Sequence, residues 1–301
     1  MFTNKYLFFA LGFSALVAGC KNEEMNDNYT DNSEELTATF GDKVSNNGLK
    51  TTLTTNGIVY NGSWYLNDTL LITDGTIASK YYTTTEGPVV AKLKRAEGQT
   101  RPNLEGGFIM AYYPGETASW NGEDGFDVKL PSTQVYNTNG LVSDDAYPMI
   151  SKSTNTSLAL YNLCSVFKFR AISELPRQIS QIRLISSNVK MTGSGVAKFD
   201  GDEPSLVMSE LAAGKKSRVV LSMSEPVDVD DRGRDFYIVV PPAIYTVDNT
   251  SIEVDVVGVG TVYFKLEFDV DLKRSTVNLY KGYIDQAIGL GTIGETGDNV
   301  D

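Results

Sequence analysis

Short runs rich in Thr, Val, Ile, Tyr and Phe follow one another along the chain from Leu36 onward. Asn, Gly, Asp and Pro residues separate these runs. β-Branched and aromatic residues placed between such turn residues are typical of β-strands. The clearest predicted strands are Trp64–Thr73, Gly107–Tyr113, Leu158–Ala171, Ser217–Met223, Phe236–Val240, Ser251–Val257 and Thr261–Val270.

Apolar and polar residues alternate most regularly in Thr261–Val270, which predicts an antiparallel strand with one buried face. Gly258 and Gly260 precede this run, so Val254–Asp271 is predicted to form a hairpin. A helical period is scarce, and Leu206–Ala213 is the one modest candidate for a short helix. The pattern therefore predicts an all-β protein.

The length of the chain favours two domains. A sequence of 301 residues is long for one small core. Dense turn signals between short strands are typical of β-sandwiches. Ser173–Gln178, which contains Pro176, interrupts the longest apolar run and is the predicted linker. We therefore predict two antiparallel β-sandwich domains, residues 36–175 and residues 176–301.

The N-terminus carries the features of a bacterial lipoprotein signal. Lys5 supplies a positive charge, and Tyr6–Val17 is an apolar run too short to cross a bilayer. Val17-Ala18-Gly19-Cys20 then matches a lipobox, with small residues before the cleavage point. We predict a signal peptide over residues 1–19 and acyl chains on the sulfur of Cys20, which would tie the protein to an envelope membrane. The alternative is an ordinary signal peptide in which Cys20 is incidental.

Residues 20–35 are predicted to be an acidic, disordered tether. Six acids, one Lys and almost no apolar residue occupy positions 21–35. Glu23 and Glu24, close behind Cys20, resemble the signal that exports some lipoproteins to the outer face of the outer membrane. A flexible spacer without such a signal is the alternative.

Composition excludes several classes of function. The net charge of −12 repels phosphate backbones, so no nucleic acid partner is expected. The chain has no His, which removes the usual general base, zinc ligand and nucleophile partner. Cys164 lies in an apolar run and is expected to be buried and inert. We therefore expect no enzymatic activity, no metal and no cofactor.

Several separated motifs occur together in an order that resembles the fimbrillin family, the subunits of type V pili. The motifs are Trp64–Ile72, Ala111–Pro114, Leu130–Tyr136, Pro148–Ser151, Leu158–Ala171, Arg183–Asn188, Thr192–Gly195, Phe236–Tyr245 and Gly282-Tyr283. No single motif is specific, but together they span residues 36–290.

The resemblance implies two tandem transthyretin-like β-sandwiches, exported as a lipoprotein. In that family a surface protease removes the lipidated N-terminus with the first strand. The groove left behind accepts a strand from another subunit, and repeated head-to-tail contacts build a filament. Here the resemblance assigns the released strand to Leu36–Phe40, with Leu36, Ala38 and Phe40 as its candidate residues.

Two positions depart from the family pattern. Cleavage in the family follows an Arg, whereas the first Arg of this chain is Arg95, so Lys43 and Lys50 are the candidate cleavage sites. The alternative is an uncleaved strand in a subunit that anchors the pilus. Gly282–Leu290 is predicted to be the last core strand. The eleven residues after it, Gly291–Asp301, have few large apolar side chains and make a poor donor strand. This favours a tip or accessory subunit, unless Val277–Ile293 as a whole serves as donor.

A carbohydrate-binding surface lipoprotein is the main alternative function. Trp120 lies in the polar stretch Gly115–Gly125 and is the candidate for stacking on a sugar ring, although packing within the loop is its default role. The favoured interpretation is a non-enzymatic pilus subunit of the outer membrane and the fimbrium. Its expected partners are other pilin subunits by strand exchange, the outer membrane through Cys20, and a glycan or protein ligand.

Overall fold

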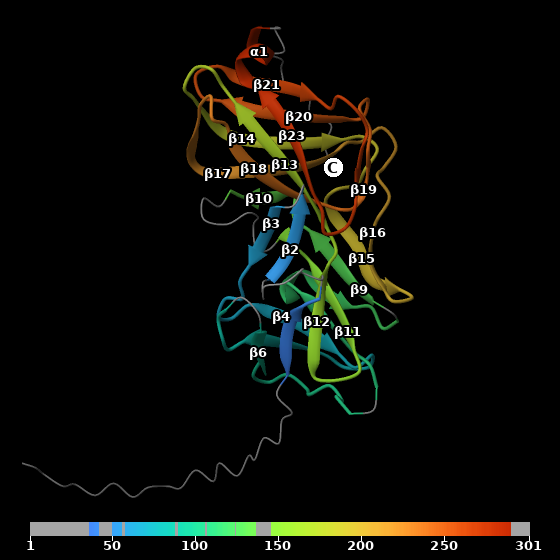
Figure 1. Cartoon of the computed structure of the whole chain (residues 1–301). Coiled ribbons are helices and arrows are strands. Elements are labelled where there is room, and N and C mark those ends of the chain that lie inside the picture. The colour runs from blue at the N-terminus through green and yellow to red at the C-terminus, as the bar shows by residue number, and fades with distance from the viewer. Residues whose placement is uncertain are drawn as a thin grey trace, which may run out of the picture. The chain divides into compact units, whose positions relative to one another are not determined.

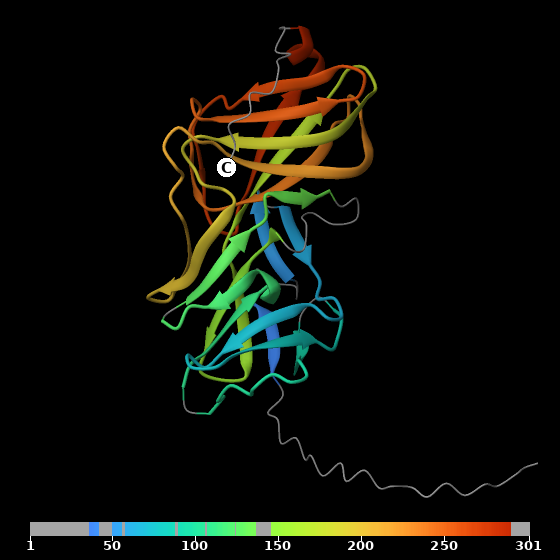
Figure 2. The same cartoon turned by 180° about the vertical axis from the view of Figure 1, so that it is seen from behind.

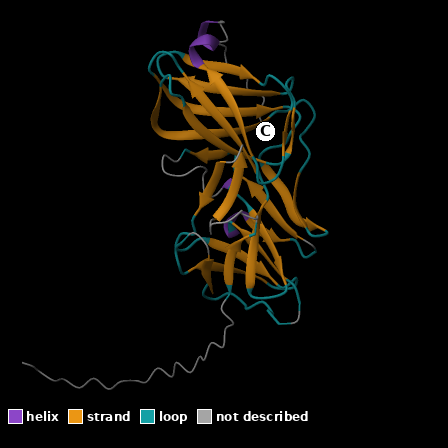
Figure 3. Cartoon of the chain, viewed as in Figure 1, coloured by secondary structure: helices purple, strands orange, loops and turns teal. Residues whose placement is uncertain are grey.

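A computed structural model describes residues 36–41, 50–55, 58–87, 90–105, 107–123, 125–136 and 146–289. Strands make up most of this part of the chain (Figure 3). This part of the chain also contains the single turn η1 (Gly115–Thr117) and the short helix α1 (Ile284–Gly289). The predicted all-β class is confirmed.

Seven strands form a closed ring that contains the start of the described chain (Figure 1). In hydrogen-bonding order they are β1 (Thr37–Phe40), β12 (Ser157–Asn162), β11 (Met149–Ser153), β7 (Ile109–Tyr113), β4 (Thr69–Thr73), β5 (Ala78–Thr83) and β6 (Val90–Arg95). β1 closes the ring because it pairs with both β12 and β6. Alternate side chains of these strands, with Trp64, fill the interior of the ring.

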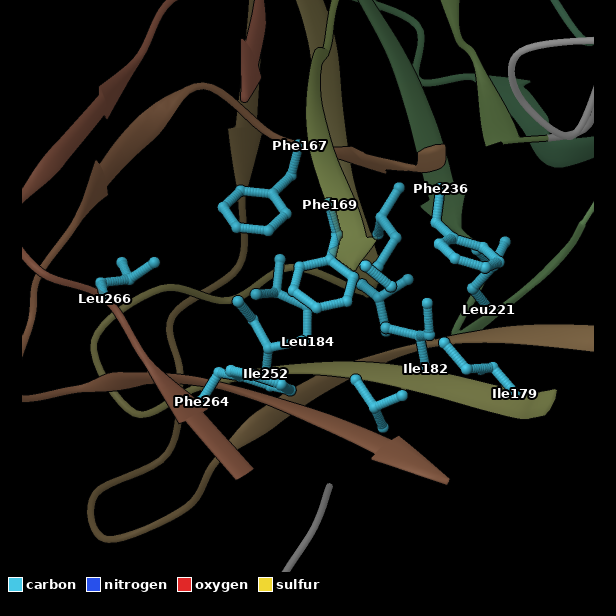
Figure 4. Packing of buried hydrophobic residues seen from close by; sticks show 14 of the residues in the cluster. Phe167, Phe169, Ile179, Ile182, Leu184, Leu221, Phe236, Ile252, Phe264 and Leu266 are labelled. Carbon is cyan, nitrogen blue, oxygen red and sulfur yellow. The ribbon is translucent and has the colours of Figure 1, made fainter. Parts of the chain in front are cut away.

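Two further sheets, built almost entirely from residues after 164, have one core between them. One sheet has the order β10 (Thr133–Val135), β17 (Ser217–Val229), β14 (Arg177–Ser186), β20 (Thr250–Val256) and β21 (Gly260–Lys265). The other has the order β18 (Arg234–Val240), β13 (Ser165–Ile172) and β23 (Val277–Tyr283). Phe167 and Phe169 of β13 point toward Leu184 of β14, and all three are buried (Figure 4).

A four-stranded sheet combines two strands that end by residue 130 with two strands that begin after residue 192. Its order is β16 (Glu203–Met208), β15 (Gly193–Asp200), β9 (Gly125–Leu130) and β8 (Ala118–Trp120), and Figure 2 shows the first two in yellow beside the green β9. Phe126 and Ala197 on this sheet pack against Tyr112 on the outside of the ring. Two short pairs complete the fold, β2 (Lys50–Thr55) with β3 (Ile58–Gly62) and β19 (Ala243–Tyr245) with β22 (Val270–Leu272).

Two sequence-based expectations for local structure were wrong. Leu206–Ala213 contains no helix, because Leu206 lies in β16, which pairs with β15. Partner strands outweigh a weak helical propensity there. The last strand was expected over Gly282–Leu290, but β23 ends at Tyr283 and α1 begins at Ile284. The predicted hairpin around Gly258 and Gly260 is confirmed, and both glycines have a positive φ.

Strand pairs join residues on either side of the predicted linker. β9 pairs with β15, and β10 pairs with β17 in parallel. β14 begins at Arg177, within Ser173–Gln178. The division into domains at residue 175 stays a prediction.

Candidate strand-acceptor site

The predicted released strand lies in the ring as β1. It pairs in parallel with β12, with Ala38 opposite Leu158 and Phe40 opposite Leu160. It pairs in the antiparallel sense with β6, with Ala38 opposite Ala91. β1 therefore occupies the full width between two strands that do not pair with each other.

Backbone hydrogen bonds hold both sides of this strand. The amide of Thr37 donates to the carbonyl of Thr156 at 2.9 Å, and the amide of Gly41 donates to that of Leu160 at 2.6 Å. On the other side, Leu93 donates to the carbonyl of Leu36 at 2.9 Å. Removing β1 would leave these backbone groups of β12 and β6 without their partners, and such edges bind another extended strand.

The inward side chains of β1 enter the core of the ring. Leu36 and Ala38 are buried, and Ala38 has no exposed surface. The half-buried Phe40 packs on Trp64, with their ring centroids 4.5 Å apart. The edge of Trp64 meets Tyr113 at 5.6 Å. Leu36, Ala38 and Phe40 therefore face the inside of the ring, and the release of this strand stays a prediction.

The walls around this segment are apolar and come from most strands of the ring. The buried residues of this cluster are Leu36, Ala38, Trp64, Leu70, Ile72, Tyr81, Ala91, Leu93, Leu104, Ile109, Ala111, Tyr113, Met149, Leu158 and Leu160. An apolar groove between two strand edges suits an extended segment with alternate apolar side chains.

Sequence reasoning missed the two strands that border β1. The single strand predicted over Leu158–Ala171 is two strands, β12 and β13. Val90–Arg95, which forms β6, was not among the predicted strands. The second segment did carry a signal, since buried Ala91 and Leu93 alternate with outward Val90, Lys92 and Lys94. Its pairing with β1 could not be inferred, because both edges of β1 depend on strands distant in sequence.

The other predicted processing residues are only partly described. Cys20 and Lys43 lie outside the described residues. Lys50 is the first residue of β2, where its backbone pairs with Gly62. Lipidation at Cys20 and cleavage at Lys43 or Lys50 stay predictions.

Trp120 ends β8, the edge strand of the four-stranded sheet. Its ring is half-buried and meets Phe126 edge-on, with centroids 5.4 Å apart. Its Nε1 donates a hydrogen bond to the carbonyl of Gly75 at 3.1 Å. These contacts give Trp120 a role in packing, and stacking on a sugar ring stays a prediction.

Cys164 is fully buried, as the sequence indicates, and burial raises the pKa of its thiol well above the ordinary value. The thiolate is the reactive form, so the native thiol should be inert. In a Cys20→Ser chain, we expect no labelling by iodoacetamide at pH 8 until denaturant is added. Labelling measured by mass spectrometry within minutes under native conditions would contradict this burial.

Within the described residues, no group of three or more His, Cys, Asp or Glu side chains could hold a metal ion. Among the same residues, no helix combines the length and apolar character required to cross a membrane.

Comparisons with known proteins define the class of the fold. The sequence matches no protein-family model and no curated protein. A solved structure from Bacteroides uniformis, described as a "putative cell adhesion protein", superposes with a TM-score of 0.52 and 16% identity over 85% of this chain and 93% of that one. One from Bacteroides ovatus with the same description has a TM-score of 0.53 and 11% identity over 83% and 91%.

A fimbrial protein from Bacteroides ovatus also matches, at a TM-score of 0.35 and 12% identity over 83% of this chain and 49% of that one. This chain shares the fold of the first two structures.

Proposed function

We propose that this protein is a non-enzymatic subunit of a surface pilus that accepts a strand from a neighbouring subunit. Proteolytic removal of the lipidated N-terminal segment, including β1, would open the groove. In this proposal the chain reaches the outer membrane through Cys20 and then joins the fimbrium. The two tandem transthyretin-like sandwiches implied by the family belong to the same proposal.

The observation that carries the proposal is the position of β1. It lies near the N-terminus, it has only four residues, and it alone separates β6 from β12. A short terminal strand between two other strands can be exchanged without unthreading the rest of the chain. The names of the structural neighbours, cell adhesion and fimbrial proteins, agree with this role.

The C-terminal contacts favour an acceptor over a donor. Asp285 in the first turn of α1 accepts hydrogen bonds from Ser173 Oγ at 2.7 Å, Leu175 N at 3.1 Å and Arg177 Nη2 at 3.0 Å. Ile284 and Ala287 of α1 are buried in the same core as β13. Releasing Val277–Ile293 as a donor would break this set, which supports a tip or accessory role.

Strand exchange can be tested on the full chain by placing a site-specific protease site between Lys43 and Asn47. After the cut, β1 is held only by noncovalent contacts. We expect a fluorescent peptide with the sequence of residues 34–42 to replace it and to co-elute with the protein in size-exclusion chromatography.

The uncut chain is the matched control and should take up no peptide, because its own β1 stays tethered. A peptide carrying Ala38→Asp should also fail with the cut chain, since it would bury an unpaired charge. If the cut chain takes up no peptide after days at several non-denaturing urea concentrations, β1 is a permanent part of the fold and the proposal is wrong.

A further inference from the structure

The backbone of the groove does not determine the direction of the strand that fills it. β12 and β6 run in opposite directions, since β1 is parallel to the first and antiparallel to the second. A strand entering in either direction would therefore form one parallel and one antiparallel ladder, which are similar in stability. Side chains of the groove must set its direction and register.

One such side chain lies over the end of β1. Tyr161 of β12 follows Leu160, which pairs with Phe40, so its ring lies on the outer side of the ring of strands beside Gly41. A Cβ atom placed on Gly41 would come within 2.8 Å of Cε1 and Cζ of Tyr161. The ring of Tyr161 therefore occupies the space that any side chain at position 41 would need.

Tyr161 is held in this place by a second aromatic ring. The edge of its ring meets Phe199 of β15, with centroids 6.4 Å apart and planes at 87°. To admit a side chain at position 41, Tyr161 would have to leave this contact. Gly41 has no positive φ, so its backbone conformation would accept alanine, and the ring alone imposes the requirement for glycine.

Two further positions restrict the same strand. Ala38 is fully buried between Leu158 and Ala91, so a larger side chain there would overpack the core. Phe40 fills the space beside Trp64. The strand that fits has a large apolar residue, then a small one two positions on, then an aromatic residue followed directly by glycine.

We propose, on the basis of the proposed function, that Tyr161 selects an incoming strand by requiring glycine after its aromatic residue, and that this strand comes from a different protein. Phe40-Gly41 is the only aromatic–glycine pair in the whole sequence. β23 has Gly282 at the corresponding spacing, but Leu279 would replace Ala38 and Lys281 would replace Phe40. Once β1 is removed, a second copy of this chain has no strand of the required pattern.

The test compares peptides of residues 34–42 in the cut full chain, with glycine or alanine at position 41. We expect the Gly41→Ala peptide to bind at least tenfold more weakly. In a Tyr161→Ala chain, both peptides should bind within twofold of each other, because alanine itself orders a free peptide at least as well as glycine. A Phe199→Ala chain, which keeps Tyr161 but removes its support, should reduce the tenfold difference.

A peptide of residues 277–283 tests selection against a second copy and should not bind measurably. Equal binding of the glycine and alanine peptides to the unmodified groove would overturn the role of Tyr161 while leaving strand exchange intact. Failure of every peptide would instead overturn the proposed function.

The same selection can be measured in the intact chain. Gly41→Ala should lower the urea midpoint of unfolding, and adding Tyr161→Ala should remove that effect. If Gly41→Ala lowers the midpoint equally with and without Tyr161, the requirement for glycine has another origin and the proposal fails.

Discussion

Replacing Trp64 with alanine is expected to destabilise the protein by about 3–5 kcal/mol, the range for removing a large buried aromatic side chain. Trp64 is 1% exposed and contacts both Phe40 of β1 and Tyr113 of β7. Its loss would leave a cavity directly beneath the C-terminal end of β1. The free energy of unfolding, measured with urea, should fall by this amount.

The effect should extend from stability to exchange. In the cut chain, Trp64→Ala should speed the loss of β1, because Phe40 loses its main partner in the groove. Leu66→Ala is the matched control, since Leu66 is 52% exposed and only two residues away. A Trp64→Ala chain as stable as the Leu66→Ala chain would show that the core of the ring does not depend on this contact.

The sequence predicted the class of the fold because alternation is a local signal. Val262 and Phe264 are buried on one face of β21, as their spacing indicates. The ring could not be predicted, because β1 pairs with β12 across more than a hundred residues and nothing local marks that partner. The prediction of the last strand was wrong for a related reason, since α1 is stabilised by contacts of Asp285 with distant Ser173 and Arg177.

The candidate site was predicted in part. The resemblance to a family assigned Leu36, Ala38 and Phe40 to a released strand; the structure places them inside the ring, and their release stays a prediction. Tyr161 was not found, because its role depends on lying beside Gly41, and an isolated tyrosine in an apolar run carries no signal of that contact. The sequence shows the residue types but not which strands pair, and the contact of Tyr161 with Gly41 depends on the pairing of β12 with β1.

An ion-pair network on the face of the five-stranded sheet gives the second large expected effect. Arg183 of β14 lies opposite Glu253 of β20, and its Nε donates to Glu253 Oε2 at 2.7 Å. Its Nη1 and Nη2 each donate to Asp255 at 2.6 Å. The side chain of Arg183 is only 8% exposed, so water can replace little of this bonding.

Arg183→Met should destabilise the protein by about 3–5 kcal/mol at pH 7, because it leaves two carboxylates close together without their cation. Burial alone would raise the pKa of Asp255, but hydrogen bonds from Arg183 and Thr261 outweigh burial and lower this pKa below its ordinary value of 3.8. A lowered native pKa means that the pairing stabilises the fold above pH 3.8 and is lost as the pH falls through the native pKa.

The destabilisation caused by Arg183→Met should therefore shrink below pH 4, where the carboxylates that repel one another in the variant become protonated. Urea unfolding at pH 7 and pH 3 measures both values. Arg232→Met is the matched control, because Arg232 pairs with Asp230 on the surface with 85% of its side chain exposed, and its loss should leave the midpoint unchanged at both pH values. An Arg183→Met penalty of equal size at pH 7 and pH 3 would show that Arg183 stabilises the sheet through packing of its methylene groups and not through charge.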